Sequence, residues 1–199
     1  MSEGPRRVEL DPRAYDDRWA RLAAAGHGVH GEADCVERLL PGIVEPGRPP
    51  RVLDAGCGTG RVAIRLAEHG CRTVGVDVDT TLLARAAAKA PECEWVAGDL
   101  AALAPDQVPG PFDAIVAAGN VMIFLAAGTE SLVVEHLAAR LAPGGVLVCG
   151  FQLTGPLTIE DYDAMVAAAG LARDARHATW DGAPFAGGDY VVAVDRLLR

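Results

Sequence analysis

The segment that most constrains the fold is a run of three alternating glycines between an apolar stretch and a helical stretch. Residues 52–61 read VLDAGCGTGR, with Gly56, Gly58 and Gly60 each separated by one residue. Glycine is needed where the backbone turns sharply or lies against a ligand without a Cβ in between. In an α/β sheet, ligands bind beyond the carboxyl ends of the strands. The segment therefore predicts a strand, a ligand-binding loop and a helix.

Short apolar runs and helical stretches alternate through the rest of the chain. This alternation indicates a mostly parallel sheet with helices on both faces. The last two expected strands are joined by a turn-rich segment, which predicts an antiparallel hairpin at the edge of the sheet. Thr158, with Asp161 three residues later, predicts a capping box at the start of a helix. We expect strands at 51–55, 71–76, 94–97, 112–117, 146–151, 172–180 and 189–196, and helices at 60–69, 80–90, 129–141 and from 158.

The residues before this alternation form a different section. The stretch 14–25 carries apolar side chains at helical spacing, and 33–40 predicts a second helix that ends before a Pro-Gly pair. We therefore divide the chain into an N-terminal helical cap, 1–48, and a main domain, 49–199.

Charge and cysteine usage exclude several classes of function. The 199 residues include 18 basic and 27 acidic side chains, a net charge of −9, which disfavours nucleic acid as a partner. We also expect no membrane association, because no apolar run approaches the roughly 20 residues that span a bilayer. The five cysteines are scattered without a Cys/His cluster, so we predict no metal site. The start of the chain shows no secretory leader, and a cytoplasmic location follows as an expectation. The oligomeric state is left open.

Two kinds of ligand fit the glycine loop. Residues 58–63 match the loose dinucleotide pattern G-x-G-x-x-A, which by itself is a weak signal. Asp54, two residues before the first glycine, argues against a pyrophosphate because its carboxylate would repel phosphate. S-adenosylmethionine is the other ligand, with an ammonium group to suit Asp54 and a carboxylate to suit the loop amides.

Five motifs in order resemble those of class I S-adenosylmethionine-dependent methyltransferases. They are VLDAGCGTG, VGVDVD, WVAGDL, PFDAIVAAGNVMIFL and LAPGGVLV, between residues 52 and 148. With the final helix and hairpin, the resemblance covers about residues 50 to 199, a typical length for one domain. It implies a Rossmann-like, doubly wound seven-stranded α/β sheet that is mostly parallel with one antiparallel edge strand.

The resemblance also implies which residues hold the cofactor. Asp77 would accept hydrogen bonds from both ribose hydroxyls, Asp99 would accept from the adenine amino group, and the Leu100 amide would donate to the ring. The residues expected at the cofactor are Asp54, Gly56, Cys57, Gly58, Gly60, Asp77, Val78, Asp99, Leu100 and Ala118. Cys57 is expected chiefly as a small residue that fits the turn.

Some of these residues have plain structural alternatives. Asp99 also suits an Asx turn after a strand. We expect Thr80 to cap the next helix and Asp79 to face solvent in a turn. Arg61 is expected as a surface guanidinium, with a contact to the methionine carboxylate or the substrate as the lesser alternative.

The acceptor side is less defined. Asn120 follows the fourth expected strand, where the methyl group should emerge, but the Asn/Asp-Pro-Pro-aromatic signature of amide-methylating relatives is missing. His27, His30 and Glu32, with Tyr15 and Trp19, are candidates for a lid. The candidates for a catalytic role are Asn120, His30 and Tyr15. Gln152, Trp180 and Asp181 are expected at the rim, and His136 and His177 at the surface or in packing.

The sequence thus predicts in-line methyl transfer from S-adenosylmethionine to a small molecule, driven mainly by proximity and exclusion of water. Two alternatives stay open: a catalytically silent cofactor-binding module and a nicotinamide-dependent oxidoreductase.

Overall fold

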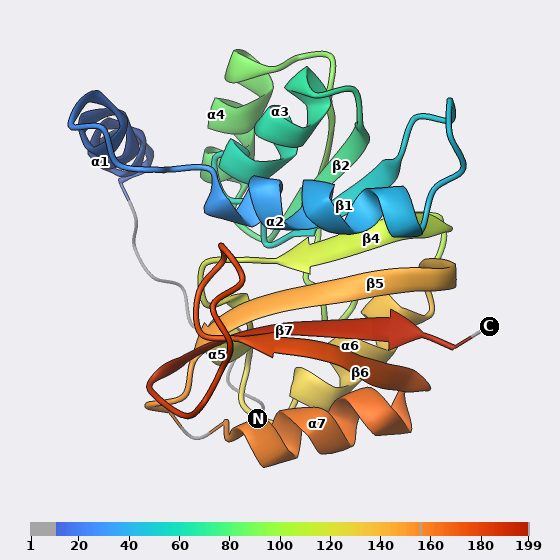
Figure 1. The fold of residues 1–199 in the computed structure, drawn as a ribbon. Coiled ribbons are helices and arrows are strands. Elements are labelled where there is room, and N and C mark those ends of the chain that lie inside the picture. The colour runs from blue at the N-terminus through green and yellow to red at the C-terminus, as the bar shows by residue number, and fades with distance from the viewer. Residues whose placement is uncertain (1–10, 156, 199) are drawn as a thin grey trace.

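The computed structural model describes residues 11–155 and 157–198, and a seven-stranded sheet runs through its centre (Figure 1). The part of the predicted cap at 1–10, including the start examined for a leader, lies outside the described residues. The strands are β1 (Arg51–Ala55), β2 (Arg72–Asp77), β3 (Glu94–Ala97), β4 (Phe112–Ala117), β5 (Leu141–Gln152), β6 (Leu171–His177) and β7 (Tyr190–Leu197). The helices are α1 (Pro12–Ala24), α2 (Gly31–Leu39), a 3-10 turn η1 (Leu40–Gly42), α3 (Arg61–Glu68), α4 (Thr80–Lys89), α5 (Val121–Phe124), α6 (Glu130–Ala138) and α7 (Ile159–Ala168).

The strand order confirms the predicted fold class and corrects one detail of it. The order is β3-β2-β1-β4-β5-β7-β6, and only β7 runs against its neighbours. The predicted antiparallel hairpin at the edge of the sheet is confirmed and consists of β6 and β7. The strand that runs against its neighbours is the inner strand of this hairpin and not the edge strand itself, because β7 lies between β5 and β6. The burial of the strands explains this order: Val191–Val194 of β7 are buried, whereas Arg173 and Asp174 of β6 are exposed and suit an edge.

Helices cover both faces of the sheet, and β1 shows why. Val52 packs in a cluster with residues of α2 and α3, and Leu53 packs in a second cluster with residues of α5, α6 and α7. Successive side chains of a strand point to opposite faces, so a strand buried on both sides reads as the continuous apolar run seen in the sequence. By the same alternation, Asp54 faces the side of α2 and α3.

Four elements differ from the sequence-based expectation by more than two residues. The helix expected at 129–141 ends at Ala138, and the strand expected at 172–180 ends at His177. β5 begins at Leu141, because Leu141 pairs with Phe112 and the register then shifts to Ala114 and Val146. The short helix α5 was not predicted. It begins after Asn120, the one non-glycine residue with positive φ (70°) in the described part of the chain.

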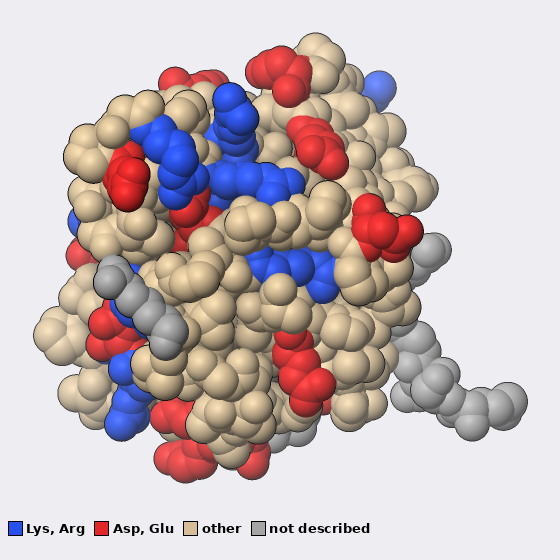
Figure 2. Space-filling model, turned by 90° about the vertical axis from the view of Figure 1, so that its right-hand side faces the viewer, with Lys and Arg blue, Asp and Glu red and all other residues tan. Residues whose placement is uncertain are grey.

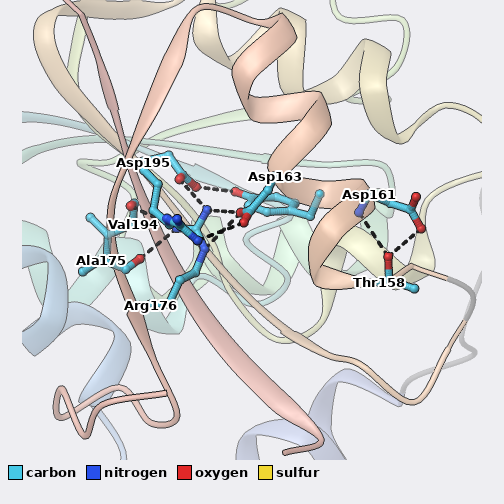
Figure 3. A network of polar contacts seen from close by, with 9 residues as sticks. Thr158, Asp161, Asp163, Ala175, Arg176, Val194 and Asp195 are labelled. Atoms are coloured by element: carbon cyan, nitrogen blue, oxygen red, sulfur yellow. Dashed lines mark hydrogen bonds and ion pairs between the residues drawn. The ribbon is translucent and has the colours of Figure 1, made fainter. Parts of the chain in front are cut away.

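A polar network joins β6 and β7, at the antiparallel edge of the sheet, to the helix α7 (Figure 3). The fully buried carboxylate of Asp195 accepts hydrogen bonds from the Tyr162 hydroxyl at 3.0 Å and from Arg176 Nη2 at 2.7 Å. Thr158 caps α7 as predicted, its hydroxyl accepting from the Asp161 amide at 3.1 Å and donating to the Asp161 carboxylate at 2.7 Å. The antiparallel end of the sheet is thereby fixed to the helix that covers it.

Candidate functional site

A cavity of about 340 Å³ opens where β1, β2 and β4 end. Its wall is built from α1, the glycine loop, the ends of β2 and β3 with the residues that follow them, and the segment after β4. The lining residues are Tyr15, Gly56, Cys57, Gly58, Thr59, Asp77, Val78, Asp79, Leu82, Gly98, Asp99, Leu100, Ala118, Gly119, Val121, Phe124 and Leu125. Of the ten residues expected at the cofactor, Asp54 and Gly60 are not on this wall, and of the three catalytic candidates Tyr15 alone lines it.

The glycine loop takes the conformation that its sequence predicts, and each glycine has its own reason. Gly56, Gly58 and Gly60 have φ angles of 78°, 56° and 80°. A Cβ on Gly56 would lie 2.4 Å from Val121, and one on Gly60 would lie 2.4 Å from Trp95. A Cβ on Gly58 would meet no atom within 4 Å. Gly56 and Gly60 are therefore required for close packing, whereas Gly58 faces open space at the cavity wall.

Most amides of this loop already have partners within the protein. The amides of Gly56 and Cys57 donate to the Val76 carbonyl, and the amide of Gly60 donates to the Cys57 carbonyl. The Gly58 amide donates to Asp77 Oδ2 at 2.8 Å. The expectation that the loop amides receive a ligand carboxylate is therefore not supported for these four residues.

Asp77 ends β2 with both carboxylate oxygens held in place. Oδ2 accepts from Gly58, and Oδ1 accepts from the Asp79 amide at 2.9 Å. A carboxylate oxygen has two acceptor positions, so each oxygen keeps one for a further donor. Because Asp77 lines the cavity, it presents a fixed pair of acceptors to a ligand.

Asp99 forms a local turn at the end of β3 and also lies on the cavity wall. Its Oδ1 accepts from the Ala101 amide at 2.9 Å, which is an Asx turn. The residue also lines the cavity beside Leu100. The Asx turn fixes the carboxylate and leaves its other oxygen for a ligand.

Asp54 has a different place from the one expected. It is 2% exposed, and its Oδ2 accepts from the Ala63 amide in the first turn of α3 at 3.0 Å. Burial raises the pKa of this carboxyl to about 7, against the lowering effect of the Ala63 hydrogen bond and of Arg61. Asp54 thus supports the loop by linking the end of β1 to the first turn of α3, because strand alternation turns its side chain toward α3 instead of into the cavity.

The start of α4 also departs from expectation. Asp79 is the N-cap, accepting from the Thr81 and Leu82 amides at 2.8 and 3.3 Å, and it lines the cavity. The assignment of the cap to Thr80, with Asp79 as a solvent-facing turn residue, was wrong. An N-cap residue has non-helical dihedrals, and Asp79 is in the extended region, whereas Thr80 is the first helical residue.

Helix α1 reaches the site through Tyr15 and the residue after it. The Asp16 carboxylate accepts from the Thr59 hydroxyl at 2.7 Å, from Arg85 Nε at 2.8 Å and from Lys89 Nζ at 3.0 Å. Burial alone would raise the pKa of Asp16, but these hydrogen bonds outweigh it and hold the pKa below its usual value. Sequence reasoning missed this cluster, because the partners are 43 to 73 residues away along the chain.

Arg61 is not the surface guanidinium that we expected. Its side chain is 13% exposed and forms a two-pronged ion pair with Glu32 of α2. It also donates to the Val29 carbonyl and stacks on Trp19 of α1, with its Cζ 4.0 Å from the ring centroid. Arg61 therefore joins the N-terminal cap to the helix that follows the glycine loop.

The remaining acceptor-side candidates do not line the cavity. Asn120 Oδ1 accepts from the Gln152 amide at 2.9 Å, which links the residues that follow β4 to the end of β5. His30 is half-buried at the start of α2, and His27 is exposed. Trp19 packs within the cap. None of these four side chains is on the cavity wall.

Trp180, expected at the rim, lies against the end of β5. Its indole Nε1 donates to the Tyr190 hydroxyl at 3.0 Å, and a Cβ on Gly150 would lie 2.2 Å from its ring. Tyr190 is a residue of this region that sequence reasoning did not single out. Asp181 is exposed. His136 and His177 are half-buried and are not on the cavity wall. His136 Nδ1 lies 3.0 Å from the carbonyl of Leu100, which is a wall residue.

Charge is distributed unevenly over the molecule. The cavity wall carries Asp77, Asp79 and Asp99 and no basic residue. Arg51 and Arg72 are the first residues of β1 and β2 and are partners in the strand register, at the strand ends away from the cavity. Figure 2 looks toward those ends, and basic side chains form a row across that face. The acidic cavity wall suits a ligand with cationic or hydroxyl groups better than one with phosphates.

No group of three or more His, Cys, Asp or Glu side chains is arranged to hold a metal ion in the described part. Among the helices at 11–155 and 157–198, none has the length and apolar character to cross a membrane.

Comparisons with known proteins agree with the geometry of this site. Residues 52–145 match the family model described as a methyltransferase domain. A solved TehB-like S-adenosylmethionine-dependent methyltransferase from Corynebacterium glutamicum is 35% identical, with a TM-score of 0.81 over 92% of this chain and 96% of that one. Trans-aconitate 2-methyltransferase of Paracidovorax citrulli is 40% identical over 98 residues, 48% of this chain and 36% of that protein.

A third relative acts on a different kind of acceptor. Ribosomal RNA small subunit methyltransferase C of Chromohalobacter salexigens is 33% identical over 174 residues, 78% of this chain and 50% of that protein. The chain thus spans half or less of the length of these two curated relatives. All of these relatives are methyltransferases, which does not support the nicotinamide-dependent alternative.

Proposed function

Because the chain belongs to the S-adenosylmethionine-dependent methyltransferases, we propose that it transfers a methyl group from S-adenosylmethionine to a small-molecule acceptor. The observation that carries the proposal is the cavity at the ends of β1, β2 and β4, with the Asp77 carboxylate fixed at its wall by the Gly58 and Asp79 amides.

The residues of the wall fit this cofactor. The two free acceptor positions of Asp77 suit the vicinal hydroxyls of a ribose. Asp99 suits an exocyclic amino group, and the Leu100 amide suits a ring nitrogen beside it. Val78, Phe124 and Leu125 supply the apolar surface that a flat base requires. The open space at Gly58 leaves room for the part of the ligand that passes the loop.

The chemistry asks little of the protein beyond position. When bound, S-adenosylmethionine supplies a methyl group that is already activated by its sulfonium. The chain's own residues have to orient the two reactants and exclude water. Tyr15 lies on the wall and α1 covers this side, so α1 is the part of the chain placed to exclude water. A general base is required only for an acceptor that must lose a proton before attack. Tyr15, His30 and Asn120 stay as candidates for that role.

A small acceptor is favoured by the charge of the chain. The net charge is −9, and the basic side chains of Figure 2 lie away from the cavity. An RNA substrate needs basic residues at the site to neutralise its phosphates.

Two measurements test the proposal. Titration calorimetry should show S-adenosylmethionine and S-adenosylhomocysteine binding with dissociation constants of about 0.1–10 μM, equivalent to about 7–10 kcal/mol. Labelled methyl transfer should then be followed in parallel reactions with a metabolite extract, ribosomal RNA and ribosomal protein. Absence of binding would refute the cofactor assignment. Label in RNA or protein would refute the small acceptor, and binding without any transfer would favour a silent module.

A further inference from the structure

We propose that Arg61 is a positioning residue that holds α1 against the cofactor cavity, so that α1 docking and cofactor binding stabilise each other. The inference rests on the proposed function, because it concerns the same cavity. It assigns Arg61 no direct contact with a ligand.

The first link is the direction of the Arg61 side chain. Arg61 opens α3 directly after Gly60, but its guanidinium points away from α3 toward the cap. There it meets Glu32, with Nη1 2.9 Å from Oε2 and a second contact between Nη2 and Oε1. Glu32 is also nearly buried, with 12% of its side chain exposed. A two-pronged pair of this kind fixes the plane of the guanidinium.

The second link leads from that plane to the cavity. Arg61 Cζ lies 4.0 Å from the Trp19 ring centroid, and the Trp19 and Tyr15 rings pack edge to face with centroids 6.1 Å apart. Tyr15 lines the cavity. An unbroken row of contacts therefore runs from the start of α3 through two aromatic rings to the cavity wall.

A separate contact ties the same loop to the same helix. Thr59, two residues before Arg61, donates its hydroxyl to Asp16, which is next to Tyr15. Both residues that flank Gly60 thus contact α1, Thr59 by a hydrogen bond to Asp16 and Arg61 by its stack on the Trp19 ring. A change in the position of the glycine loop is transmitted to α1 at two points.

Because α1 is weakly packed, these contacts determine whether it stays docked. No residue of α1 is buried, whereas Ala33, Cys35 and Val36 of α2 are buried in the core. Segments with few buried apolar contacts open locally at low free energy. If docking of α1 completes the wall, a bound ligand must stabilise the docked helix, and docking must raise ligand affinity by the same factor.

Calorimetry with S-adenosylhomocysteine tests the row of contacts. Trp19→Leu interrupts the row of contacts but leaves the Arg61–Glu32 pair in place. It therefore tests the inference even if the Arg61 variant does not fold. We expect Trp19→Leu and Arg61→Met each to weaken binding about tenfold, and the double variant to be within about twofold of the weaker single, since coupled residues are not additive. Arg65→Met, one turn along α3, is the matched control and should bind as the unaltered protein does.

Hydrogen exchange gives a readout that does not depend on affinity. Amides of residues 12–24 should exchange more slowly when S-adenosylhomocysteine is bound, and Trp19→Leu should remove most of that protection while leaving α7 unchanged. Two results would overturn this inference and leave the proposed function standing, provided that the unaltered protein binds the ligand. One is that the effects of Trp19→Leu and Arg61→Met on affinity are additive. The other is that hydrogen exchange in α1 is the same with and without ligand. If the unaltered protein does not bind the ligand at all, both are overturned.

Discussion

The amide of Gly58 donates to Asp77 Oδ2 at 2.8 Å, and this hydrogen bond joins the loop after β1 to the end of β2. The loop and the acidic strand end are 19 residues apart in sequence. The bond orients the carboxylate that the proposed function needs and at the same time fixes the turn of the loop. The two features that looked like separate motifs are therefore one unit.

Asp77→Asn should weaken S-adenosylhomocysteine binding strongly. Asn replaces one carboxylate oxygen with an NH₂ group and removes the charge, so a ribose hydroxyl that donates to Asp77 in the proposed complex loses a hydrogen bond to a charged acceptor. Within the protein, the NH₂ group would also face the amide of Gly58 or Asp79. Hydrogen bonds to a charged acceptor are worth about 1.5–3 kcal/mol, which corresponds to about a 10- to 150-fold rise in the dissociation constant. Calorimetry measures it, with Asp106→Asn, an exposed carboxylate in a distant loop, as the control. An unchanged constant would remove Asp77 from the site.

Asp54→Asn should change how stability depends on pH. The pKa of Asp54 is raised from 3.8 to about 7 by burial. A carboxyl with a raised pKa keeps its proton longer in the folded state, so its contribution to stability falls as the pH rises from about 4 to 7 and then levels off. The variant has no such proton, and it should gain in urea-unfolding free energy relative to the unaltered protein from pH 5 to pH 8. A constant difference between the two proteins would contradict the raised pKa.

Gly150→Ala should destabilise the fold although the backbone there is ordinary. Gly150 is buried in β5 and has no positive φ, but an added Cβ would lie 2.2 Å from the Trp180 ring and 2.6 Å from the Tyr190 hydroxyl. Overpacking of this kind costs about 1–3 kcal/mol. In the background of Trp180→Ala the same substitution should cost less, because the ring is gone. Equal costs in both backgrounds, measured by urea unfolding, would show that the ring is not the reason for the glycine.

Asp16→Asn should weaken the attachment of α1 and make the affinity for S-adenosylhomocysteine less dependent on salt. Asp16 contacts Arg85 and Lys89, both partly exposed, so its ion pairs are screened by salt. The pKa of Asp16 is lowered on folding. Its stabilising effect is therefore complete at neutral pH and is lost only as the pH falls through the folded pKa, below 3.8.

We expect S-adenosylhomocysteine affinity of the unaltered protein to fall about two- to fivefold between 50 mM and 500 mM salt, in line with the small worth of exposed ion pairs. Asp16→Asn should bind more weakly and show little of this dependence. Asp17→Asn, the exposed neighbour, is the control. A salt dependence that persists in Asp16→Asn would place the effect elsewhere.

Asn120 allows its backbone and side-chain roles to be separated. Its φ of 70° and its hydrogen bond to the Gln152 amide both hold the turn after β4. Asn120→Ala should lose about 1–3 kcal/mol of stability, from the left-handed conformation and the unpaired amide. Asn120→Gly should recover the backbone part. If Asn120 acts on the acceptor, both variants lose methyl transfer equally. If its role is only structural, transfer follows stability and the glycine variant is the more active.

Local sequence patterns were sufficient to predict much of this molecule. Three alternating glycines predicted the turn after β1, since positive φ at alternate positions is open to few other residues. Apolar runs between helical stretches predicted a covered sheet. The resemblance to the methyltransferase motifs implied that Asp77 and Asp99 lie at the cofactor site, and both line the cavity.

The differences have two kinds of cause. Some are local: the alternation of β1 turns Asp54 toward α3, and the cap of α4 is Asp79 instead of Thr80. Others depend on long-range contacts. Arg61 was expected at the surface because its partner Glu32 is 29 residues away. The position of β7 inside the sheet depended on which strand could tolerate an edge.

The sequence by itself thus determined most of the helices and strands, the turn of the glycine loop and the family, since each depends on residues that are close together in the chain. Only the tertiary structure decided which charges are paired. Asp16 with Thr59, and Arg61 with Glu32 and Trp19, come together from separate helices. The reason is physical: backbone geometry and periodicity are set over a few residues, whereas an ion pair depends on how whole helices pack.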